Sequence, residues 1–259
     1  MSLRIVILWL LACACASGQL IGPGAVRTTS PRAPGNVKAP PAGGGSNPTP
    51  IWFLATNIVD VATQYNTNTV DTTGLPATCL LVSIWHTYQV NNPQTNLANG
   101  IVMTVLQQTN SYSGDLGTNY GFGIAYLVPP SNGIFKVAYN ADSGAPIETS
   151  FSTLVYTNVH QTTPFGTAVV DWSGAVRPGM TNTVTSAAND LIFDAIAWND
   201  GAVGSVGSGQ TRRALADPAP NDSSEASSEK ASEGATSTMR WSGFTSAQKA
   251  WIGAAMKAP

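Results

Sequence analysis

The stretch YGFGIAYLVPPSNGIFKVAYN, from Tyr120 to Asn140, carries the clearest structural signal in the chain. Its first part alternates between large and very small side chains, which is the period of two expected for a β-strand. The large side chains on one face are Tyr120, Phe122, Ile124 and Tyr126. We expect this face to line a core, and the small residues opposite to let another layer or a ligand approach closely.

A turn and a second alternating segment complete this stretch. PPSNG, residues 129–133, has turn chemistry, and IFKVAYN then places Phe135, Val137 and Tyr139 on one side. Further strand candidates are Thr78–Tyr88, Ile101–Gln107, Ser150–Val159, Thr181–Ser186, Asp190–Trp198, Thr236–Trp241 and Trp251–Lys257. About eight to ten strands predict an all-β fold, an antiparallel two-sheet β-sandwich of jelly-roll or immunoglobulin-like type. Only TSAQKAWIGAAM also fits a helix, and its end fits a strand equally well.

The first residues have the pattern of a secretory signal peptide. The apolar run IVILWLLACACA ends in small side chains, so we expect residues 1–16 to be removed by cleavage before Ser17. Leu10-Leu11-Ala12-Cys13 also resembles a bacterial lipobox, in which Cys13 would carry a lipid. The sequence therefore predicts a secreted or cell-surface protein, with a lipoprotein as the alternative.

Two further segments differ in composition from the predicted strands. Residues 17–50 hold seven prolines and a triple glycine, which predicts a semi-extended tether before a single β-sandwich domain over 51–259. Residues 207–235 are poor in apolar side chains and hold five of the fourteen acidic residues, which predicts a mobile loop with a solvated surface.

Charge and cysteine content exclude some classes of protein. Charged residues make up 10% of the chain, the formal net charge is −2, and no basic stripe is present to neutralise phosphates, which argues against a nucleic-acid partner. After cleavage only Cys79 would remain, so an internal disulfide is excluded. We expect Cys79, within an apolar run, to be a buried, inert thiol.

The second half resembles a recurrent, uncharacterised extracellular β-sandwich module of bacteria and their phages. The matching pieces, spread over about residues 119–258, are GIAYLVPPSNGIFKVAYN, VYTNVHQTTPFG, NDLIFDAIAWNDG, GSGQTRR and EKASEGATSTMRWSGFTSAQKAWIGAAMKA. The resemblance implies a non-catalytic surface or appendage module, with no catalytic residues to transfer. Asn158 and His160 stand where the family has the Gly and Asp of a Gly-Val-Asp-Gln-Thr-Thr-Pro run.

Patterns of known catalytic sites are missing from the sequence. There is no G-x-S-x-G elbow for a Ser/His/Asp triad, and no E-x-D-x-E strand of the kind used by glycanases on jelly rolls. Zinc-type spacings and phosphate-binding glycine loops are also missing. We interpret His160 as a turn residue and His86 as a core-edge residue bonded to backbone. The sequence predicts no enzyme and no cofactor.

Asp190 and Asp194 are the weak candidates for a metal site. They share a strand face with Ile192, Ile196 and Trp198. A carboxylate in phase with apolar residues is either buried and hydrogen-bonded or a Ca²⁺ ligand between sheets. Calcium needs six or more oxygen ligands, and no compact D-x-D-x-D loop is present, so structural hydrogen bonding is the expectation.

Two strand ends combine an indole with polar side chains and are candidates for glycan binding. They are Trp198-Asn199-Asp200 and Asp171-Trp172. An aromatic face can stack on a pyranose while Asn and Asp bind its hydroxyls. The alternative is that each Trp packs in or beside the core and that Asn-Asp-Gly forms a turn.

Three function classes follow from these observations. The first is a structural or adhesive surface module that binds a cell-surface polymer or assembles with itself. The second is a carbohydrate-binding module that uses the two Trp corners. The third is a glycan hydrolase or lyase, which the missing carboxylate pattern disfavours. A membrane would be contacted only through the lipid anchor.

Overall fold

The computed structural model describes residues 49–50, 55–59, 65–88, 94–113, 119–141, 148–173, 177–199, 204–216, 224–245 and 249–259. Every named element in these residues is a β-strand, and every pairing between strands is antiparallel. The prediction of an all-β, antiparallel fold is confirmed. The predicted signal peptide, including Cys13, lies outside the described residues, as does the predicted tether up to residue 48.

The first half of the chain forms two sheets. Its strands are β1 (Thr49–Pro50), β2 (Ala55–Val59), β3 (Tyr65–Asp71), β4 (Leu80–Tyr88), β5 (Gln94–Ala98), β6 (Ile101–Val102), β7 (Thr104–Ser113), β8 (Asn119–Leu127), β9 (Ile134–Ala141) and β10 (Glu148–Thr157). The first inner sheet has the order β1-β10-β4-β8-β7, and β2 also pairs with β10; the first outer sheet has the order β3-β9-β5-β6. The last residues of the predicted tether, Thr49 and Pro50, thus belong to the first inner sheet.

The second half forms two more sheets. Its strands are β11 (Val169–Ser173), β12 (Gly179–Thr185), β13 (Leu191–Trp198), β14 (Ser205–Val206), β15 (Thr211–Ala216), β16 (Ser224–Ala231), β17 (Thr236–Ser242) and β18 (Lys249–Met256). The second inner sheet has the order β11-β18-β13-β16-β15, and the second outer sheet has the order β12-β17-β14.

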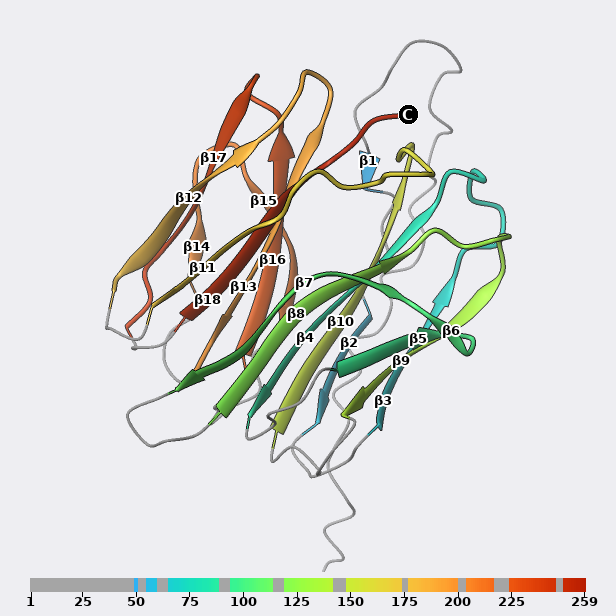
Figure 1. Cartoon of the computed structure of the whole chain (residues 1–259), viewed down its shortest axis with the longest axis horizontal. Helices are drawn as coiled ribbons and strands as arrows, with labels where there is room; N and C mark the ends of the chain where they lie inside the picture. The colour runs from blue at the N-terminus through green and yellow to red at the C-terminus, as the bar shows by residue number, and fades with distance from the viewer. Residues whose placement is uncertain are drawn as a thin grey trace, which may run out of the picture.

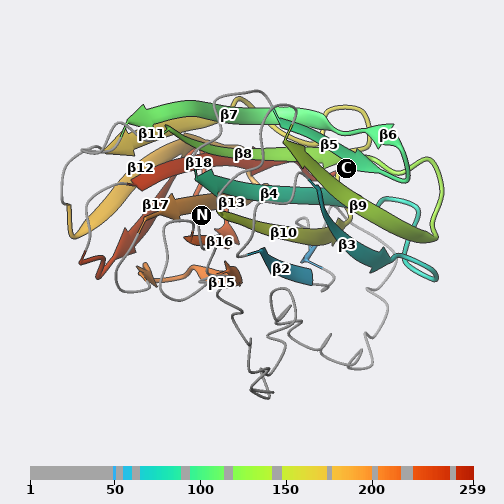
Figure 2. The ribbon, with the colours of Figure 1, turned by 90° about the horizontal axis from the view of Figure 1, so that it is seen from below.

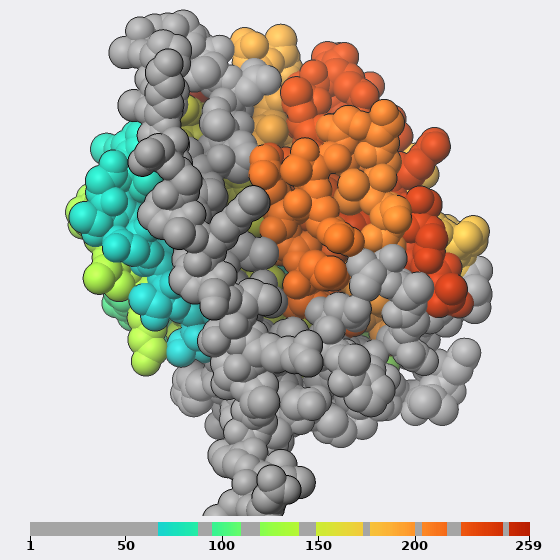
Figure 3. Space-filling model, turned by 180° about the vertical axis from the view of Figure 1, so that it is seen from behind, coloured from blue at the N-terminus to red at the C-terminus, as the bar shows by residue number. Residues whose placement is uncertain are grey.

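The four sheets are stacked in the order first outer, first inner, second inner and second outer (Figures 1 and 2). Three separate apolar cores lie between successive layers. Seen from behind (Figure 3), the cyan atoms of the first half lie on one side and the orange and red atoms of the second half on the other. The middle core, between the two inner sheets, joins the halves, and we call this interface the seam.

The two halves repeat the same strand order. The strands β11 to β18 of the second half can be matched, one by one, to β2, β3, β4, β5, β7, β8, β9 and β10 of the first half. With this matching, equivalent strands have the same neighbours in the two inner sheets and in the two outer sheets. The sequence predicts eight to ten strands in two sheets, whereas the described part of the chain contains 18 strands in four sheets.

A repeated irregularity sets the residue equivalence between the halves. The β7–β8 register shifts between Val105 and Gln107, and the β15–β16 register shifts between Arg212 and Ala214. Leu106 and Arg213 are therefore equivalent extra residues, each forming a β-bulge. Across the seam, β7 contacts β11 and β18, and the equivalent strand β15 contacts β2 and β10. The seam therefore has the self-complementary pattern of a twofold dimer interface.

Three central strands of the inner sheets, β4, β13 and β18, are buried on both faces, which explains their sequences. All eight residues of β13 and of β18 are buried, and so are Leu80 to Thr87 of β4. Such strands read as nearly continuous apolar runs instead of alternating ones. β18 includes most of the stretch that also fitted a helix, and here the strand alternative is the observed one.

The aromatic face of the opening stretch lines a core, as predicted. Tyr120, Phe122 and Ile124 of β8 lie in the seam core. On the opposite face, Gly123 lies under Trp85, where a Cβ would overlap the six-membered ring of the indole. The small residues thus allow another layer, the first outer sheet, to pack closely.

The prediction of a mobile loop over 207–235 is wrong for the described residues of that stretch. They include β15 and β16, and β16 is an inner strand whose residues 224–230 are all buried. The polar side chains of β16 are buried because partners from other strands face them; Glu229, for example, forms an ion pair with Arg213. Low apolar content predicts solvent exposure only where such partners are missing.

Candidate functional site

The first predicted glycan corner is not available to a sugar. The Trp198 indole is fully buried in the core between the second inner and outer sheets, with its ring centroid 5.4 Å from that of Phe244. Asn199 donates from Nδ2 to the Tyr120 hydroxyl at 3.2 Å. Asp200 lies outside the described residues. The prediction fails for Trp198, because strand alternation turns its side chain into the core.

The second corner is split between two faces of β11. Successive side chains of a strand point to opposite faces. Asp171 lies on the side of the second outer sheet, where the Asn182 amide nitrogen donates to its Oδ2 at 3.0 Å in the amide orientation that satisfies both ends of the Asn182 side chain. Trp172 shares the other side with Val170, and its indole is 55% exposed. Asp171 and Trp172 therefore cannot act on one sugar together, which corrects the predicted pairing.

Asp194 is the hub of a buried hydrogen-bond network. Its Oδ2 accepts hydrogen bonds from Trp241 Nε1 at 2.8 Å and from Trp251 Nε1 at 2.7 Å. Its Oδ1 accepts one from Ser228 Oγ at 2.5 Å. Burial raises the pKa of Asp194 to about 6, while the bonds from Ser228, Trp251 and Trp241 lower it. These hydrogen bonds hold the Asp194 carboxylate inside the core, which it stabilises.

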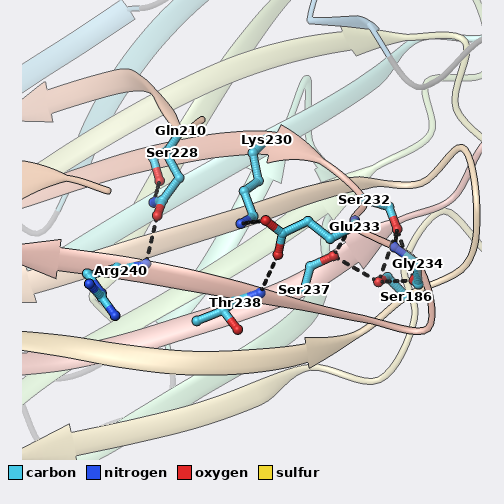
Figure 4. A network of polar contacts seen from close by, with 10 residues as sticks. All are labelled: Ser186, Gln210, Ser228, Lys230, Ser232, Glu233, Gly234, Ser237, Thr238 and Arg240. Atoms are coloured by element: carbon cyan, nitrogen blue, oxygen red, sulfur yellow. Dashed lines mark hydrogen bonds and ion pairs between the residues drawn. The ribbon is translucent and has the colours of Figure 1, made fainter. Parts of the chain in front are cut away.

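The network continues from Ser228, the partner of Asp194, through Gln210 to the Arg240 backbone (Figure 4). Gln210 Nε2 donates to Ser228 Oγ at 2.8 Å, and Gln210 Oε1 accepts from the Arg240 amide at 2.7 Å. These bonds connect β13, β16 and β17, which belong to two different sheets. These residues connect the inner sheet to the outer sheet.

A second group of polar contacts in Figure 4 closes the β16–β17 hairpin. Lys230 pairs with Glu233 at 2.8 Å, and the Glu233 amide donates to Ser237 Oγ at 2.8 Å. Ser186, at the end of β12, donates from Oγ to the Gly234 carbonyl at 2.7 Å. Asp190, a weak metal candidate, accepts from the Ala187 amide at 2.7 Å through Oδ2 in the neighbouring turn. Within the described residues, no group of three or more His, Cys, Asp or Glu is placed to hold a metal.

The seam contains a polar cluster that the sequence interpretation missed. Three alternating residues of β16 face the first inner sheet, and their equivalents in β8 are apolar. The β16 residues are Glu225, Ser227 and Glu229, and their equivalents are Phe122, Ile124 and Tyr126. The bulge residues differ in the same way, since Leu106 packs on the apolar side and Arg213 pairs with Glu229 on the polar side. The strand arrangement of the seam is therefore twofold, but its side chains are not. We call the part of the seam around Phe122, Ile124 and Tyr126 the apolar wing, and the part around Glu225, Ser227 and Glu229 the polar wing.

Burial shifts the pKa values of the polar wing. Burial raises the pKa of Glu225 to about 8, while the facing hydroxyls of Ser152 and Ser150 lower it without reaching hydrogen-bonding geometry. Burial also raises the pKa of Glu229, against the lowering effect of Arg213. The Tyr156 hydroxyl, fully buried beside Glu229, has a raised pKa for the same reason. A pKa of about 8 favours the neutral form of the Glu225 carboxyl near pH 7.

The alternation that could have revealed this cluster is present in SEASSEKA. Its two glutamates and the serine between them fall on one face of a strand, but its serine-rich composition, taken alone, predicts a loop. The spacing resembles the alternating carboxylates of glycanases on jelly rolls. Here, however, Glu225 is 0% exposed and Glu229 is 4% exposed, so neither carboxyl lines a surface open to a polysaccharide.

The two histidines and Cys79 have structural partners. His86 is buried, with Nδ1 3.0 Å from the Ser224 carbonyl, and burial lowers its pKa to about 3. His160 Nδ1 accepts from the Thr163 amide at 3.1 Å within its turn. The buried Cys79 thiol donates to the Pro76 carbonyl at 2.9 Å, and burial raises its pKa to about 11. A thiol with a raised pKa is a weak nucleophile at neutral pH.

Comparisons with known proteins return no relative. No family model, no curated protein and no solved structure matches the chain. In the part of the chain that the structure describes, no helix has the length and hydropathy needed to span a bilayer.

Proposed function

We propose that the chain is a secreted, non-catalytic structural module of an extracellular surface that works by adhesion or assembly. The observation that carries this proposal is the burial of the carboxyl groups that a mechanism would need. Asp194 and Glu225 are 0% exposed and Glu229 is 4% exposed, and each is faced by side chains of the same chain. A hydrolase or lyase requires such groups within reach of its substrate.

The polar networks support a structural role for the same residues. Asp194, Ser228 and Gln210 connect the inner and outer sheets of the second half, and the seam joins both halves through one shared core. Stability built from stacked layers and buried hydrogen bonds needs no disulfide, which fits a chain whose described residues contain one free cysteine. The resemblance to an extracellular bacterial and phage module, given above, agrees with this role.

Turnover assays test the non-catalytic part of the proposal. We expect the purified chain to release no new reducing or unsaturated ends from a panel of bacterial and plant polysaccharides. The matched variants are Asp194→Asn and Asp171→Asn. Turnover that Asp194→Asn abolishes and Asp171→Asn leaves intact would overturn the proposal.

Cell fractionation tests the extracellular part. In a bacterial host, we expect the chain to be exported and cleaved near residue 16, with Cys13→Ala leaving export unchanged if no lipid is attached. Retention of the uncleaved chain in the cytoplasm would contradict secretion, whatever the outcome of the turnover assays. Recovery of a lipid-modified chain would select the lipoprotein alternative.

Glycan binding remains the second candidate function, and one observation favours it. The half-exposed Trp172 indole offers an aromatic surface of the kind that stacks on a pyranose. The variant Trp172→Ala should abolish binding to any glycan that an array detects, while the tryptophan's neighbour can be tested separately with Asp171→Asn. Trp198→Ala is unsuitable for this test, because removal of a buried indole would destabilise the fold.

A further inference from the structure

The two halves carry equivalent edge strands that differ in charge. β7 ends the first inner sheet, and its equivalent β15 ends the second inner sheet. β15 carries Arg212 and Arg213, which are both exposed. β7 spans ten residues, Thr104–Ser113, without a charged residue, and Val105 occupies the position equivalent to Arg212. One edge is therefore charged and the other is neutral.

Exposed apolar side chains gather near the neutral edge. The large hydrophobic residues exposed on the described surface are Ile101, Val102, Val105, Ile134 and Trp172. Two of them, Ile101 and Val102, form β6, which leads directly into β7, and Val105 lies on β7 itself. Trp172 lies on β11, which contacts β7 across the seam. Figure 2 shows β7 along one long side of the molecule, next to β11.

A free edge of this kind is open to pairing with another strand. No described strand pairs with the second side of β7, so its outward backbone groups lack partners within the sheet. Soluble proteins usually protect long edges with charged residues, and β15 shows that protection in this same chain. The two register shifts of β7 leave a regular segment at 107–110, which is the part best suited to pairing.

We propose that two copies of this chain pair edge to edge through β7, in antiparallel orientation. In a twofold antiparallel pairing residue i faces residue j while j faces i, and residues near the axis lie close to their own copies, so a strand with charges near its centre would bring like charges together. A strand without charges avoids this repulsion, whereas β15 would place Arg212 and Arg213 against the same residues of the second copy. The pairing would join two inner sheets into one continuous sheet and bring the apolar residues near β7 into the interface. This inference deepens the proposed function by naming the partner.

Sedimentation velocity of the full chain over a range of concentrations tests the pairing. We expect the wild-type chain to form dimers, and Val105→Arg to raise the dimer dissociation constant by more than about tenfold, since it places a charge that must be desolvated among the apolar residues that the pairing would bury. The matched control is Ile134→Arg, which adds the same charge at an exposed apolar residue of β9 and should leave the dissociation constant within about twofold of wild type. Because Val105 is 42% exposed in the single chain, its substitution should leave the unfolding midpoint unchanged.

Hydrogen exchange gives a readout that needs no variant. Amides of residues 107–110 should gain protection as the wild-type concentration rises, while those of 211–214 in β15 should not. A wild-type chain that sediments as a monomer at every concentration would overturn the pairing. Equal weakening by Val105→Arg and Ile134→Arg, or concentration-dependent protection in β15 alone, would overturn it as well. None of these outcomes depends on catalytic turnover, so the turnover assays test the non-catalytic function separately from the pairing.

Discussion

At the scale of single residues, equivalent positions of the two halves make different numbers of hydrogen bonds. Ser83 of β4 and Asp194 of β13 are equivalent. Each pairs with a residue of the neighbouring inner strand, and that residue in turn pairs with the edge-strand residue just before the repeated bulge. Ser83 Oγ makes one hydrogen bond, to Asn96 Oδ1 at 3.2 Å. Asp194 accepts three, two of them from indoles. The sequence placed Asp194 on an apolar face, but the three donors come from residues 34, 47 and 57 positions away and could not be identified from local spacing.

Removal of the Asp194 carboxyl group should therefore cost far more than removal of the Ser83 hydroxyl. Asp194→Ala leaves two indole N–H groups and one hydroxyl buried without acceptors, and we expect a loss of about 3–5 kcal/mol in the free energy of unfolding. Ser83→Ala should cost about 1 kcal/mol. Urea unfolding of both variants measures the difference, and equal losses would show that Asp194 is not the hub of the core.

At the scale of the strand, close approach between layers depends on residues without side chains. Gly123 of β8 lies directly against the Trp85 indole, which packs into the core between the first inner and outer sheets. The alternation of tiny and large residues predicted this approach from the sequence. The identity of the partner could not be predicted, because Trp85 lies on another strand and in a run whose two faces are both buried.

Adding a methyl group at Gly123 should thus destabilise the fold. Its Cβ would collide with the six-membered ring of Trp85, so we expect Gly123→Ala to cost about 2–3 kcal/mol through overpacking. Gly133→Ala is the matched control, because no heavy atom lies within 4 Å of its added Cβ. Thermal melts followed by far-ultraviolet circular dichroism measure both. A Gly123→Ala midpoint no lower than that of Gly133→Ala would contradict the packing described here.

At the scale of the whole molecule, the seam unites the two halves and buries an acid between them. The groups that face Glu225 and its neighbours from the surrounding strands are His86 on β4, Tyr156 on β10, Arg213 on β15 and Glu229 on β16 itself. Only Arg213 and Glu229 form an ion pair among these groups. The ionisation of Glu225 would place an unpaired charge in the seam, which links the stability of the joint to pH.

The stability of the chain should fall as the pH rises from about 6.5 to 8. The pKa of Glu225 is raised from 4.5 to about 8, so the unfolded chain loses this proton first and the folded state is progressively disfavoured up to pH 8. The pKa of His86 is lowered from 6.5 to about 3, so its effect has the opposite sign and lies below pH 6.5. The pKa of Asp194 is raised to about 6, so its ionisation changes the stability of the fold mainly below pH 6.5. Between pH 6.5 and 8, Glu225 should contribute a loss of roughly 1.4 kcal/mol per pH unit.

Glu225→Gln removes this titration and tests the seam. Denaturant unfolding at several pH values should show a flatter dependence for the variant, and a stability above wild type at pH 8. Asp171→Asn, on the face of β11 toward the second outer sheet and away from the seam, is the control and should keep the wild-type slope. Parallel curves for wild type and Glu225→Gln would show that Glu225 is ionised, or solvated, in the folded chain.

The all-β class, the core faces of β8 and β9 and most of the strand positions could be predicted from the sequence, because alternation and turn chemistry are local properties of the chain. Which layer covers each face could not be predicted. Strand periodicity indicates which side chains share a face, but the partners of that face come from segments that can be distant in sequence. These distant contacts bury Trp198, leave Trp172 exposed and make SEASSEKA a central strand. The repeated strand order and the buried acid in the seam depend on the same distant contacts.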